Sequence, residues 1–358
     1  MHAPTIAAIT LDETGGGIAA VSRLLWDVAR QEWGTRARLL TMFDHESRPA
    51  TFVEKARFTA ALTRAQTFGQ TDWILFTHLA LAKIHKAAPD RLRRPYGVFL
   101  HGIEAWKRLT AAEIDTLARA EVRIANSRFT AARVADAHPG VGPIVHCPLA
   151  LTVQPAPRPL AQPAQSFGAH AVLSVGRMSG AERYKGHDEL IAAWPGVLAK
   201  VPDADLVLAG DGDDASRLKE KAAASGVGGR IHFTGFLPAA DLDALYRSAA
   251  LFALPSRAEG FGLVYLEAME RGLACVGSVH DAAGEVIVDG ETGRLVDQSD
   301  VRTLAETIAA LLLDDDGRRR MGAAGNHRVR SEFTFQQFKL RVCHLLNRQH
   351  PSYVPVGA

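Results

Sequence analysis

The 358-residue chain is poor in cysteine and has no long apolar run. Its three cysteines, Cys147, Cys275 and Cys343, lie far apart and form no C-x-x-C pair, so neither a disulfide framework nor a zinc knuckle is expected. No apolar run approaches the roughly 20 residues that a membrane-spanning helix needs. The first residues lack the basic start and the small-residue cleavage site of a secretory signal. These absences favour a protein of the reducing cytoplasm.

Signatures of metal and nucleic-acid binding are also missing. The 14 histidines form no H-x-x-x-H or H-E-x-x-H pattern, so no metal site is predicted. Two D-x-D triplets occur, at 211–213 and 241–243. We interpret the first as the cap of a helix that follows a strand, and the second as part of an amphipathic helix. No dense stripe of lysine and arginine alternates with aromatic residues, which argues against a nucleic-acid partner.

The net charge of +2 conceals an asymmetry along the chain. Residues 1–160 contain 20 lysines and arginines against 14 acids, a balance of +6, whereas residues 161–358 contain 21 against 25, a balance of −4. The basic half suits an anionic surface or a phosphorylated acceptor. Solvated arginines in an arginine-rich protein explain the same balance equally well, and both interpretations stay open.

The chain contains two series of alternating strand and helix signals, each typical of a doubly wound parallel sheet. The first series predicts strands at 4–10, 37–43, 72–78, 96–102, 122–127 and 144–150. The second series predicts strands at 170–177, 203–212, 230–236, 251–256, 273–278 and 293–297. Amphipathic segments between these runs supply the crossover helices. We therefore expect an α/β protein with two Rossmann-like domains.

A proline-rich segment separates the two series. Residues 154–165 hold four prolines and show no periodicity, which indicates an interdomain linker. We predict an N-terminal domain at 1–160, a C-terminal domain at 161–332, and a terminal segment at 333–358 whose helix packs back toward the first domain. Open α/β sheets bind ligands outside the carboxyl ends of their strands, so we expect the site in loops facing a central cleft between the sheets.

Three consecutive glycines, Gly15, Gly16 and Gly17, directly follow the first predicted strand at the start of a helix. Because glycine has no Cβ, backbone N–H groups there can approach a phosphate at the helix N-terminus. The G-x-G-x-x-G dinucleotide fingerprint is absent. A phosphate-binding loop and a plain tight turn are equally good interpretations of these residues.

Two cations lie at one strand–helix junction of the second series. Arg177 ends a predicted strand, and Lys185 follows eight residues later, just before a helix that begins near Gly186. Two cations that converge at such a junction suit a diphosphate. Solvated surface cations are the alternative interpretation.

The strongest signal is the segment P-S-R-A-E-G-F-G-x4-E at 255–267. Glu259 stands where a strand gives way to a glycine loop, and Glu267 lies two turns into the next helix. A carboxylate can accept hydrogen bonds from vicinal hydroxyls, as found on a ribose or a hexose. The spacing alone means little, because 39 acids in 358 residues produce such pairs by chance. The adjoining glycine loop is what indicates a sugar, a phosphate and a ribose side by side.

Taken together, these residues resemble the retaining GT-B glycosyltransferases of family 4, the glycosyl transferases group 1. The resemblance covers residues 170–330 with the spacing intact. The segments that carry it are Arg177 with Y-K-G at 184–186, L-V-L-A-G-D-G-D at 206–213, F-T-G-F-L at 233–237, the segment 255–267 and D-G-E-T-G-R-L-V-D at 289–297. The first half is similar more loosely, through T-G-G-G at 14–17 and His101-Gly102. The resemblance implies that the domain at 1–160 binds the acceptor and that the domain at 161–332 binds the nucleotide-sugar donor.

The resemblance implies a role for each matching residue. The catalytic set would be His101 near the anomeric centre, Arg177 and Lys185 on the donor diphosphate, and Glu259 on the hydroxyls of the transferred sugar. Glu267 would bind the ribose of the donor. The other donor-binding residues would be Gly15, Gly16, Gly17, Gly210, Phe236, Leu237, Gly260, Phe261, Gly262 and Leu263.

The same resemblance implies a hexosyltransferase that needs no metal and no cofactor. Such an enzyme would move a hexose from a UDP- or GDP-sugar to a hydroxyl of a glycan or lipid-linked acceptor, in polysaccharide or glycolipid synthesis, with retention of anomeric configuration. The leaving phosphate would accept the proton of the acceptor, since the sequence offers no obvious separate base. A sugar-nucleotide epimerase on the same fold, and a nucleotide-sugar-binding protein without turnover, are the alternatives.

The basic first half suggests a membrane partner for such an enzyme. Five cations lie close together in the segment 83–95, namely Lys83, Lys86, Arg91, Arg93 and Arg94. Near an anionic leaflet each such cation contributes about 1 kcal/mol. We therefore hypothesise that the acceptor is attached to an anionic lipid, and that the N-terminal half docks weakly at the inner membrane face.

Overall fold

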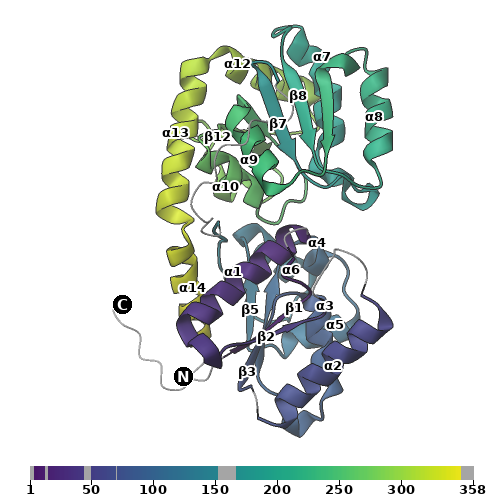
Figure 1. The fold of residues 1–358 in the computed structure, drawn as a ribbon, viewed down its shortest axis with the longest axis vertical. Coiled ribbons are helices and arrows are strands. Elements are labelled where there is room, and N and C mark those ends of the chain that lie inside the picture. Colours follow the sequence, from purple (N-terminus) through teal and green to yellow (C-terminus); the bar gives the residue numbers. More distant parts are fainter. Residues whose placement is uncertain (1–3, 13–14, 44–49, 70, 152–166, 348–358) are drawn as a thin grey trace. The chain divides into compact units, whose positions relative to one another are not determined.

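The computed structural model describes residues 4–12, 15–43, 50–69, 71–151 and 167–347 (Figure 1). The chain divides into two compact units, which are described separately. Residues 1–152 with 335–358 form unit 1, and residues 153–334 form unit 2. Each unit contains a six-stranded parallel sheet. The linker predicted at 154–165 lies outside the described residues.

Unit 1 is built on a sheet with the strand order β2-β1-β3-β4-β5-β6. Strands β1, β4 and β5 are buried along their whole length, as expected for parallel strands whose two faces are both covered. The strands are β1 Pro4–Ala8, β2 Arg38–Thr41, β3 Trp73–Phe76, β4 Tyr96–Leu100, β5 Val122–Ala125 and β6 Val145–His146. The helices are α1 Gly16–Trp33, α2 Phe52–Thr67, α3 Leu79–Ala82, α4 Ile103–Trp106, α5 Ala111–Ala118, α6 Arg128–Ala137 and α14 Phe335–Asn347.

Helix α1 connects the sheet of unit 1 to the C-terminal helix. The hydroxyls of Ser22 on α1 and Thr77, just after β3, lie 2.8 Å apart and share a hydrogen bond. On α14, Nζ of Lys339 lies 3.4 Å from Oε2 of Glu32 near the end of α1. The helix predicted at 333–349 is therefore present as α14, and it is part of unit 1.

Unit 2 is built on a sheet with the strand order β12-β11-β10-β7-β8-β9. Its core contains the fully buried Trp194 on α7 together with Leu304 and Ile308 on α12. The strands are β7 Ala171–Val175, β8 Asp205–Ala209, β9 Ile231–Gly235, β10 Leu251–Ala253, β11 Cys275–Ser278 and β12 Gly293–Val296. The helices are α7 His187–Leu198, α8 Ala215–Ala224, α9 Ala239–Ser248, α10 Leu263–Glu270, α11 Ala283–Val286, α12 Val301–Leu313 and α13 Asp315–Glu332.

All twelve predicted strands are present, each shorter than its apolar run. In both sheets the order of the strands reverses once. The chain changes direction between β1 and β3 in unit 1, and between β7 and β10 in unit 2. Open α/β sheets bind ligands at the carboxyl ends of the strands beside such a switch point. The loops after these four strands are therefore the places where functional side chains are expected.

Candidate functional site

An ion pair joins the two loops at the switch point of unit 2. Lys185 ends a 3-10 turn after β7, and Glu259 lies in the loop after β10. Nζ of Lys185 lies 3.1 Å from Oε2 of Glu259, and both side chains are largely buried. Burial lowers the pKa of Lys185, but the nearby charges of Glu259 and its neighbours outweigh that effect, so the pKa lies above its usual value. Lys185 therefore keeps its positive charge at the site.

Two glycines after β8 allow a close approach to the loop that carries Arg177. A Cβ on Gly210 would lie 2.0 Å from the carbonyl oxygen of Gly176, and one on Gly212 would lie 2.2 Å from that of Met178. Both glycines have positive φ angles, 142° and 158°. The two loops therefore meet backbone to backbone, which explains why the segment 206–213 contains glycine at these positions.

Two further glycines shape the loop and helix start around Glu259. A Cβ on Gly186 would lie 2.3 Å from the carbonyl oxygen of Pro255, which brings the turn of Lys185 against the end of β10. Gly262, with φ of 87°, precedes the first residue of α10, and a Cβ there would lie 2.4 Å from the ring of Tyr265. At Gly186 a side chain would clash with the backbone of Pro255, and at Gly262 it would clash with the ring of Tyr265.

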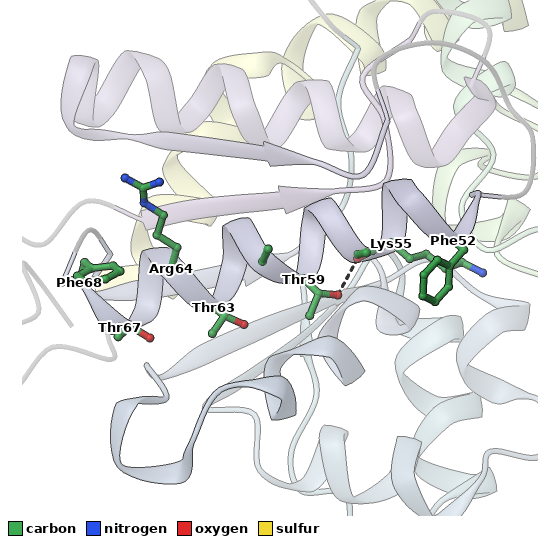
Figure 2. A pocket seen from close by; sticks show the side chains of 9 residues that line it. Phe52, Lys55, Thr59, Thr63, Arg64, Thr67 and Phe68 are labelled. Atoms are coloured by element: carbon green, nitrogen blue, oxygen red, sulfur yellow. Dashed lines mark hydrogen bonds between the residues drawn. The ribbon is translucent and has the colours of Figure 1, made fainter.

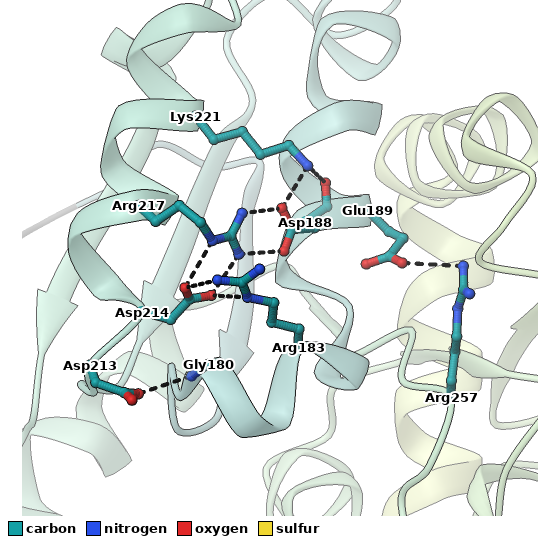
Figure 3. Close-up of polar contacts among 9 residues, drawn as sticks. All are labelled: Gly180, Arg183, Asp188, Glu189, Asp213, Asp214, Arg217, Lys221 and Arg257. Carbon is teal, nitrogen blue, oxygen red and sulfur yellow. Dashed lines mark hydrogen bonds and ion pairs between the residues drawn. The ribbon is translucent and has the colours of Figure 1, made fainter.

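A network of arginines and aspartates fixes the turn that carries Lys185 (Figure 3). Asp214 has only 6% of its side chain exposed, and it accepts hydrogen bonds from Arg183 at 2.9 and 3.2 Å and from Arg217 at 2.6 and 2.8 Å. Arg217 also binds both carboxylate oxygens of Asp188 on α7, at 2.7 and 2.8 Å. These hydrogen bonds, chiefly from Arg217, hold the pKa of Asp214 below its usual range. The turn is thereby anchored to the loop after β8.

The contacts of Asp211 and Asp213 correct the predicted helix cap at 211–213. Helix α8 has no side-chain cap hydrogen bond. Asp213 instead accepts a hydrogen bond from the N–H of Gly180 at 2.9 Å, and Asp211 accepts one from the N–H of Gly212 at 2.8 Å. A reading of the local sequence favours a cap, because the partner of Asp213 lies 33 residues earlier in the chain.

A buried aspartate supports the backbone of Glu259. Asp281, 7% exposed, accepts hydrogen bonds from the N–H of Glu259 at 3.1 Å and from the N–H of Ala283 at 2.9 Å. Burial raises the pKa of Asp281 to about 7. On the other side of the loop, the buried ring of Phe261 lies 6.0 Å from the ring of Phe333. The loop with Glu259 is thus held in place from two sides.

Arg177 and Glu267 form their polar contacts away from the Lys185–Glu259 pair. Oε2 of Glu267 accepts a hydrogen bond from the hydroxyl of Tyr246 at 2.8 Å, and burial raises the pKa of Glu267. Arg177, largely exposed, forms an ion pair with Glu182. Within the described residues, no hydrogen bond or ion pair joins Arg177 or Glu267 to the Lys185–Glu259 pair. Phe236 is 65% exposed, Leu237 is half-buried, and Gly260 lies between Glu259 and Phe261.

The predicted residues of unit 1 lie at the carboxyl ends of β1 and β4. Helix α1 begins at Gly16, and the preceding Gly15 provides no side-chain cap. A Cβ added to Gly16 or Gly17 would meet no atom within 4 Å, so the helix start borders open space. His101 follows β4, and its Nε2 lies 2.6 Å from the carbonyl oxygen of Thr77.

Several polar residues beside the predicted set were not singled out from the sequence. They are His78 and Asn126 in unit 1, and Asp214 and Asp281 in unit 2. His78 ends the predicted strand 72–78, and Asn126 lies near the end of the predicted strand 122–127. Their position at the carboxyl ends of strands could have identified them as candidate site residues. The partners of Asp214 and Asp281 are distant in the chain and give no local pattern.

The described residues lack both a metal-ligand cluster and a membrane-spanning helix. No group of three or more histidine, cysteine, aspartate and glutamate side chains among them is arranged to hold a metal ion. No helix in the described part of the chain is long and apolar enough to cross a membrane.

The chain is similar to one protein family and to several mannosyltransferases. Residues 167–328 match the family model described as glycosyl transferases group 1. One relative is the GDP-mannose-dependent alpha-(1-6)-phosphatidylinositol monomannoside mannosyltransferase of Mycolicibacterium smegmatis, 32% identical over 231 residues, which are 62% of this chain and 60% of the relative. Another is the phosphatidyl-myo-inositol mannosyltransferase of Mycobacterium leprae, 38% identical over 160 residues, which are 44% of this chain and 41% of the relative. The chain thus spans less than two thirds of the length of either relative.

Solved structures give the fold class. The crystal structure of Anabaena HepE in complex with UDP and glucose matches with a TM-score of 0.77 and 20% identity, over 97% of this chain and 100% of HepE. Two six-stranded parallel sheets together with this likeness define the GT-B fold. Residues 167–328 thus resemble the glycosyl transferases group 1.

Proposed function

We propose that this protein is a retaining hexosyltransferase of family 4, which transfers a hexose from a nucleotide sugar to a hydroxyl of a lipid-linked or glycan acceptor. The observation that carries the proposal is the largely buried pair of Lys185 and Glu259 at the switch point of unit 2. A cation for a phosphate and a carboxylate for sugar hydroxyls lie 3.1 Å apart, as adjoining parts of one ligand require. Relatives of 32% and 38% identity that are mannosyltransferases support the same activity.

In the proposed reaction Lys185 and Arg177 bind the donor diphosphate and offset the charge that grows on it. Glu259 accepts hydrogen bonds from the sugar hydroxyls and fixes the sugar against that diphosphate. The bond from C1 of the sugar to the diphosphate oxygen breaks while a bond from the acceptor oxygen to C1 forms on the same face. The proton of the acceptor hydroxyl passes to an oxygen of the leaving phosphate. The charge of the two cations makes a metal ion unnecessary in this scheme.

The donor assay uses the full chain with two donors. GDP-mannose is the donor in the name of the M. smegmatis relative, and UDP-glucose combines the two ligands of the HepE complex. Vesicles that contain phosphatidylinositol serve as the acceptor. We expect nucleotide release that rises with acceptor, and a product with the anomeric configuration of the donor by NMR. Donor binding without release of nucleotide would instead indicate a binding protein. Conversion of the donor to another sugar nucleotide would indicate an epimerase.

We further propose a cytoplasmic protein that docks at an anionic membrane through helix α2. Ion pairs engage three of the five cations in the segment 83–95: Lys83 with Glu113, Lys86 with Asp115, and Arg93 with Asp90. Helix α2 instead combines exposed aromatic rings with cations (Figure 2). Phe52 at its start is 85% exposed and Phe68 just past its end is 71% exposed. Its cations are Lys55, Arg57 and Arg64, which have no ion pair among the described residues.

A helix with exposed aromatic rings and basic side chains suits the headgroup layer of an anionic leaflet. Co-sedimentation with phosphatidylglycerol vesicles and with phosphatidylcholine vesicles tests the docking. We expect pelleting that requires the anionic lipid, fades with added salt and falls in the double variant Phe52→Ser, Phe68→Ser. Leu340→Ser, an exposed apolar residue of α14, is the matched control. Equal pelleting with both lipids would contradict the docking.

A further inference from the structure

Tyr246, a fully buried side chain of helix α9, reaches a carboxylate on helix α10. Its hydroxyl donates a hydrogen bond of 2.8 Å to Oε2 of Glu267, which lies 21 positions further along the chain. Burial holds the pKa of Tyr246 well above its usual value. The phenol therefore stays protonated near neutral pH, and its hydroxyl is a constant donor to Glu267.

Arg271 fixes the position of the Tyr246 ring. Its guanidinium carbon lies 5.2 Å from the centroid of that ring, and its Nε donates to Oδ1 of Asp243 on α9 at 2.7 Å. Its Nη1 donates to the carbonyl oxygen of Glu267 at 2.8 Å. The ring of Tyr246 also packs against Phe252 of β10, with centroids 5.9 Å apart. These contacts belong to the ring, so a phenylalanine would keep them and lose only the hydroxyl.

Glu267 keeps acceptor positions beyond the one that Tyr246 occupies. Its side chain is half-buried, and Oε1 makes no hydrogen bond within the described part of the chain. A carboxylate has about four acceptor positions, and Tyr246 takes one of them. Burial raises the pKa of Glu267, whereas the hydrogen bond from Tyr246 and the charge of Arg271 lower it. Tyr246 therefore both orients the carboxylate and favours its ionised form.

The acceptor of this hydrogen bond sets Tyr246 apart from two other buried tyrosines. Tyr96 donates to the carbonyl oxygen of Thr116, and Tyr265 donates to that of Leu254, each at 2.6 Å. Those bonds satisfy a buried hydroxyl but orient no side chain. Tyr246 instead holds an ionisable side chain that the resemblance places at the ribose of the donor.

We propose that Tyr246 is a positioning residue for the ribose of the donor. Its hydroxyl holds Oε2 of Glu267, which leaves the other acceptor positions of the carboxylate for the vicinal ribose hydroxyls. A carboxylate that is already held loses less rotational freedom when the nucleotide binds, so the ribose is bound more tightly. Tyr246 acts only through Glu267 and does not contact the donor. The inference rests on the proposed function and on the ribose role of Glu267 that the resemblance implies.

The test measures nucleotide binding and needs no acceptor. The full chain is titrated calorimetrically with GDP and with 2′,3′-dideoxy-GDP, which lacks both vicinal hydroxyls, and with the matching uridine pair. For the base that binds, we expect the parent to prefer the ribonucleotide by about tenfold or more. In Tyr246→Phe this preference should fall to about threefold or less, while the affinity for the dideoxy nucleotide stays within about twofold of the parent value.

Two comparisons separate positioning from a loss of stability. Tyr96→Phe loses a buried tyrosine hydrogen bond in unit 1, so it should lower the thermal midpoint as Tyr246→Phe does but keep the full preference for ribose. Glu267→Ala should abolish the preference. Addition of Tyr246→Phe to Glu267→Ala should then cause no further loss of ribonucleotide affinity, because a residue that acts through Glu267 has nothing left to position.

Three results would overturn the inference: a parental preference in Tyr246→Phe, additive losses in the double variant, or a parent that binds both forms of the nucleotide equally. In each of these cases the parent still binds nucleotide, so the proposed function survives. A parent that binds neither GDP nor UDP would overturn the proposed function, and the inference with it.

Discussion

Lys185 and Glu259 lie 74 positions apart in the chain, yet their side chains meet at 3.1 Å. They meet because β7 and β10 are neighbours in the sheet although two strands and their helices separate them in the sequence. The contact joins a group suited to phosphate with a group suited to sugar hydroxyls. Each of the two side chains therefore supports the orientation of the other before any donor binds.

Loss of either proposed diphosphate cation should weaken nucleotide binding. A charge-assisted hydrogen bond contributes about 1.5–3 kcal/mol, so Lys185→Ala and Arg177→Ala should each reduce the affinity for GDP or UDP by roughly tenfold to a hundredfold. Isothermal titration calorimetry measures this affinity. Lys200→Ala, an exposed lysine at the end of α7, is the control. Parental affinity in both cation variants would remove the diphosphate assignment.

The two glutamates should separate by the part of the donor that each contacts. Glu259→Ala should lower the rate of transfer by about 10²-fold or more. It should change the affinity for free nucleotide much less, because sugar hydroxyls are the only part of the donor that Glu259 is proposed to contact, and Lys185 keeps its charge when it loses this partner. Glu267→Ala should weaken the free nucleotide as well, because the ribose belongs to both ligands. Transfer rates and nucleotide titrations on the same two variants check the division. The same pattern of loss in both would be inconsistent with it.

The anchor of the Lys185 turn should matter for both stability and donor binding. Asp214→Ala removes the acceptor for Arg183 and Arg217, with a loss of about 1–3 kcal/mol in the free energy of unfolding. The freed turn should also bind the donor more weakly. Urea unfolding and donor titration measure the two effects. Asp205→Ala, which removes another arginine-paired aspartate at the opposite end of β8, should lower stability alone.

The buried carboxyl of Asp281 should give the protein a distinct dependence of stability on pH. Its pKa is raised to about 7 in the folded chain, so between its ordinary value of 3.8 and about 7 the folded state binds more protons than the unfolded state. The stability that Asp281 contributes is therefore complete at low pH and is lost as the pH rises through 7. The free energy of unfolding of Asp281→Asn, taken relative to that of the parent, should therefore be higher at about pH 8 than at about pH 5. Urea unfolding at both values checks this, and a constant difference would contradict it.

Activity should survive removal of divalent metal. The proposed scheme offsets the phosphate charge with Lys185 and Arg177 alone. Transfer in excess EDTA should therefore match transfer in untreated enzyme, as measured by nucleotide release. An enzyme that stops in EDTA and recovers with Mg²⁺ or Mn²⁺ would bring Asp211 and Asp213 back as candidate ligands.

The sequence predicted what depends on local pattern. Alternating apolar runs located all twelve strands, and the glycine-rich segments after β8 and β10 marked places where the backbone itself comes close to a neighbour. It did not predict interactions formed by strand order. The cap assigned to 211–213 was wrong, because the partner of Asp213 is Gly180 on another loop. The ion pairs of Lys83 and Lys86 likewise depend on Glu113 and Asp115, which helix α5 places there.

The backbone contact between the loops after β7 and β8 has a practical consequence for redesign of the protein. Carbonyl groups of Gly176 and Met178 occupy the space beside Gly210 and Gly212, so the two loops touch through their backbones at these points. This contact adds to the side-chain contacts of Asp213 and Asp214 that hold the same loops together. Phe236, an exposed residue that the resemblance includes among the donor-binding residues, takes no part in this backbone contact. An engineer who wants to change the preference for the donor should therefore vary Phe236 and leave the two glycines untouched, because alanine at either position would force the loops apart.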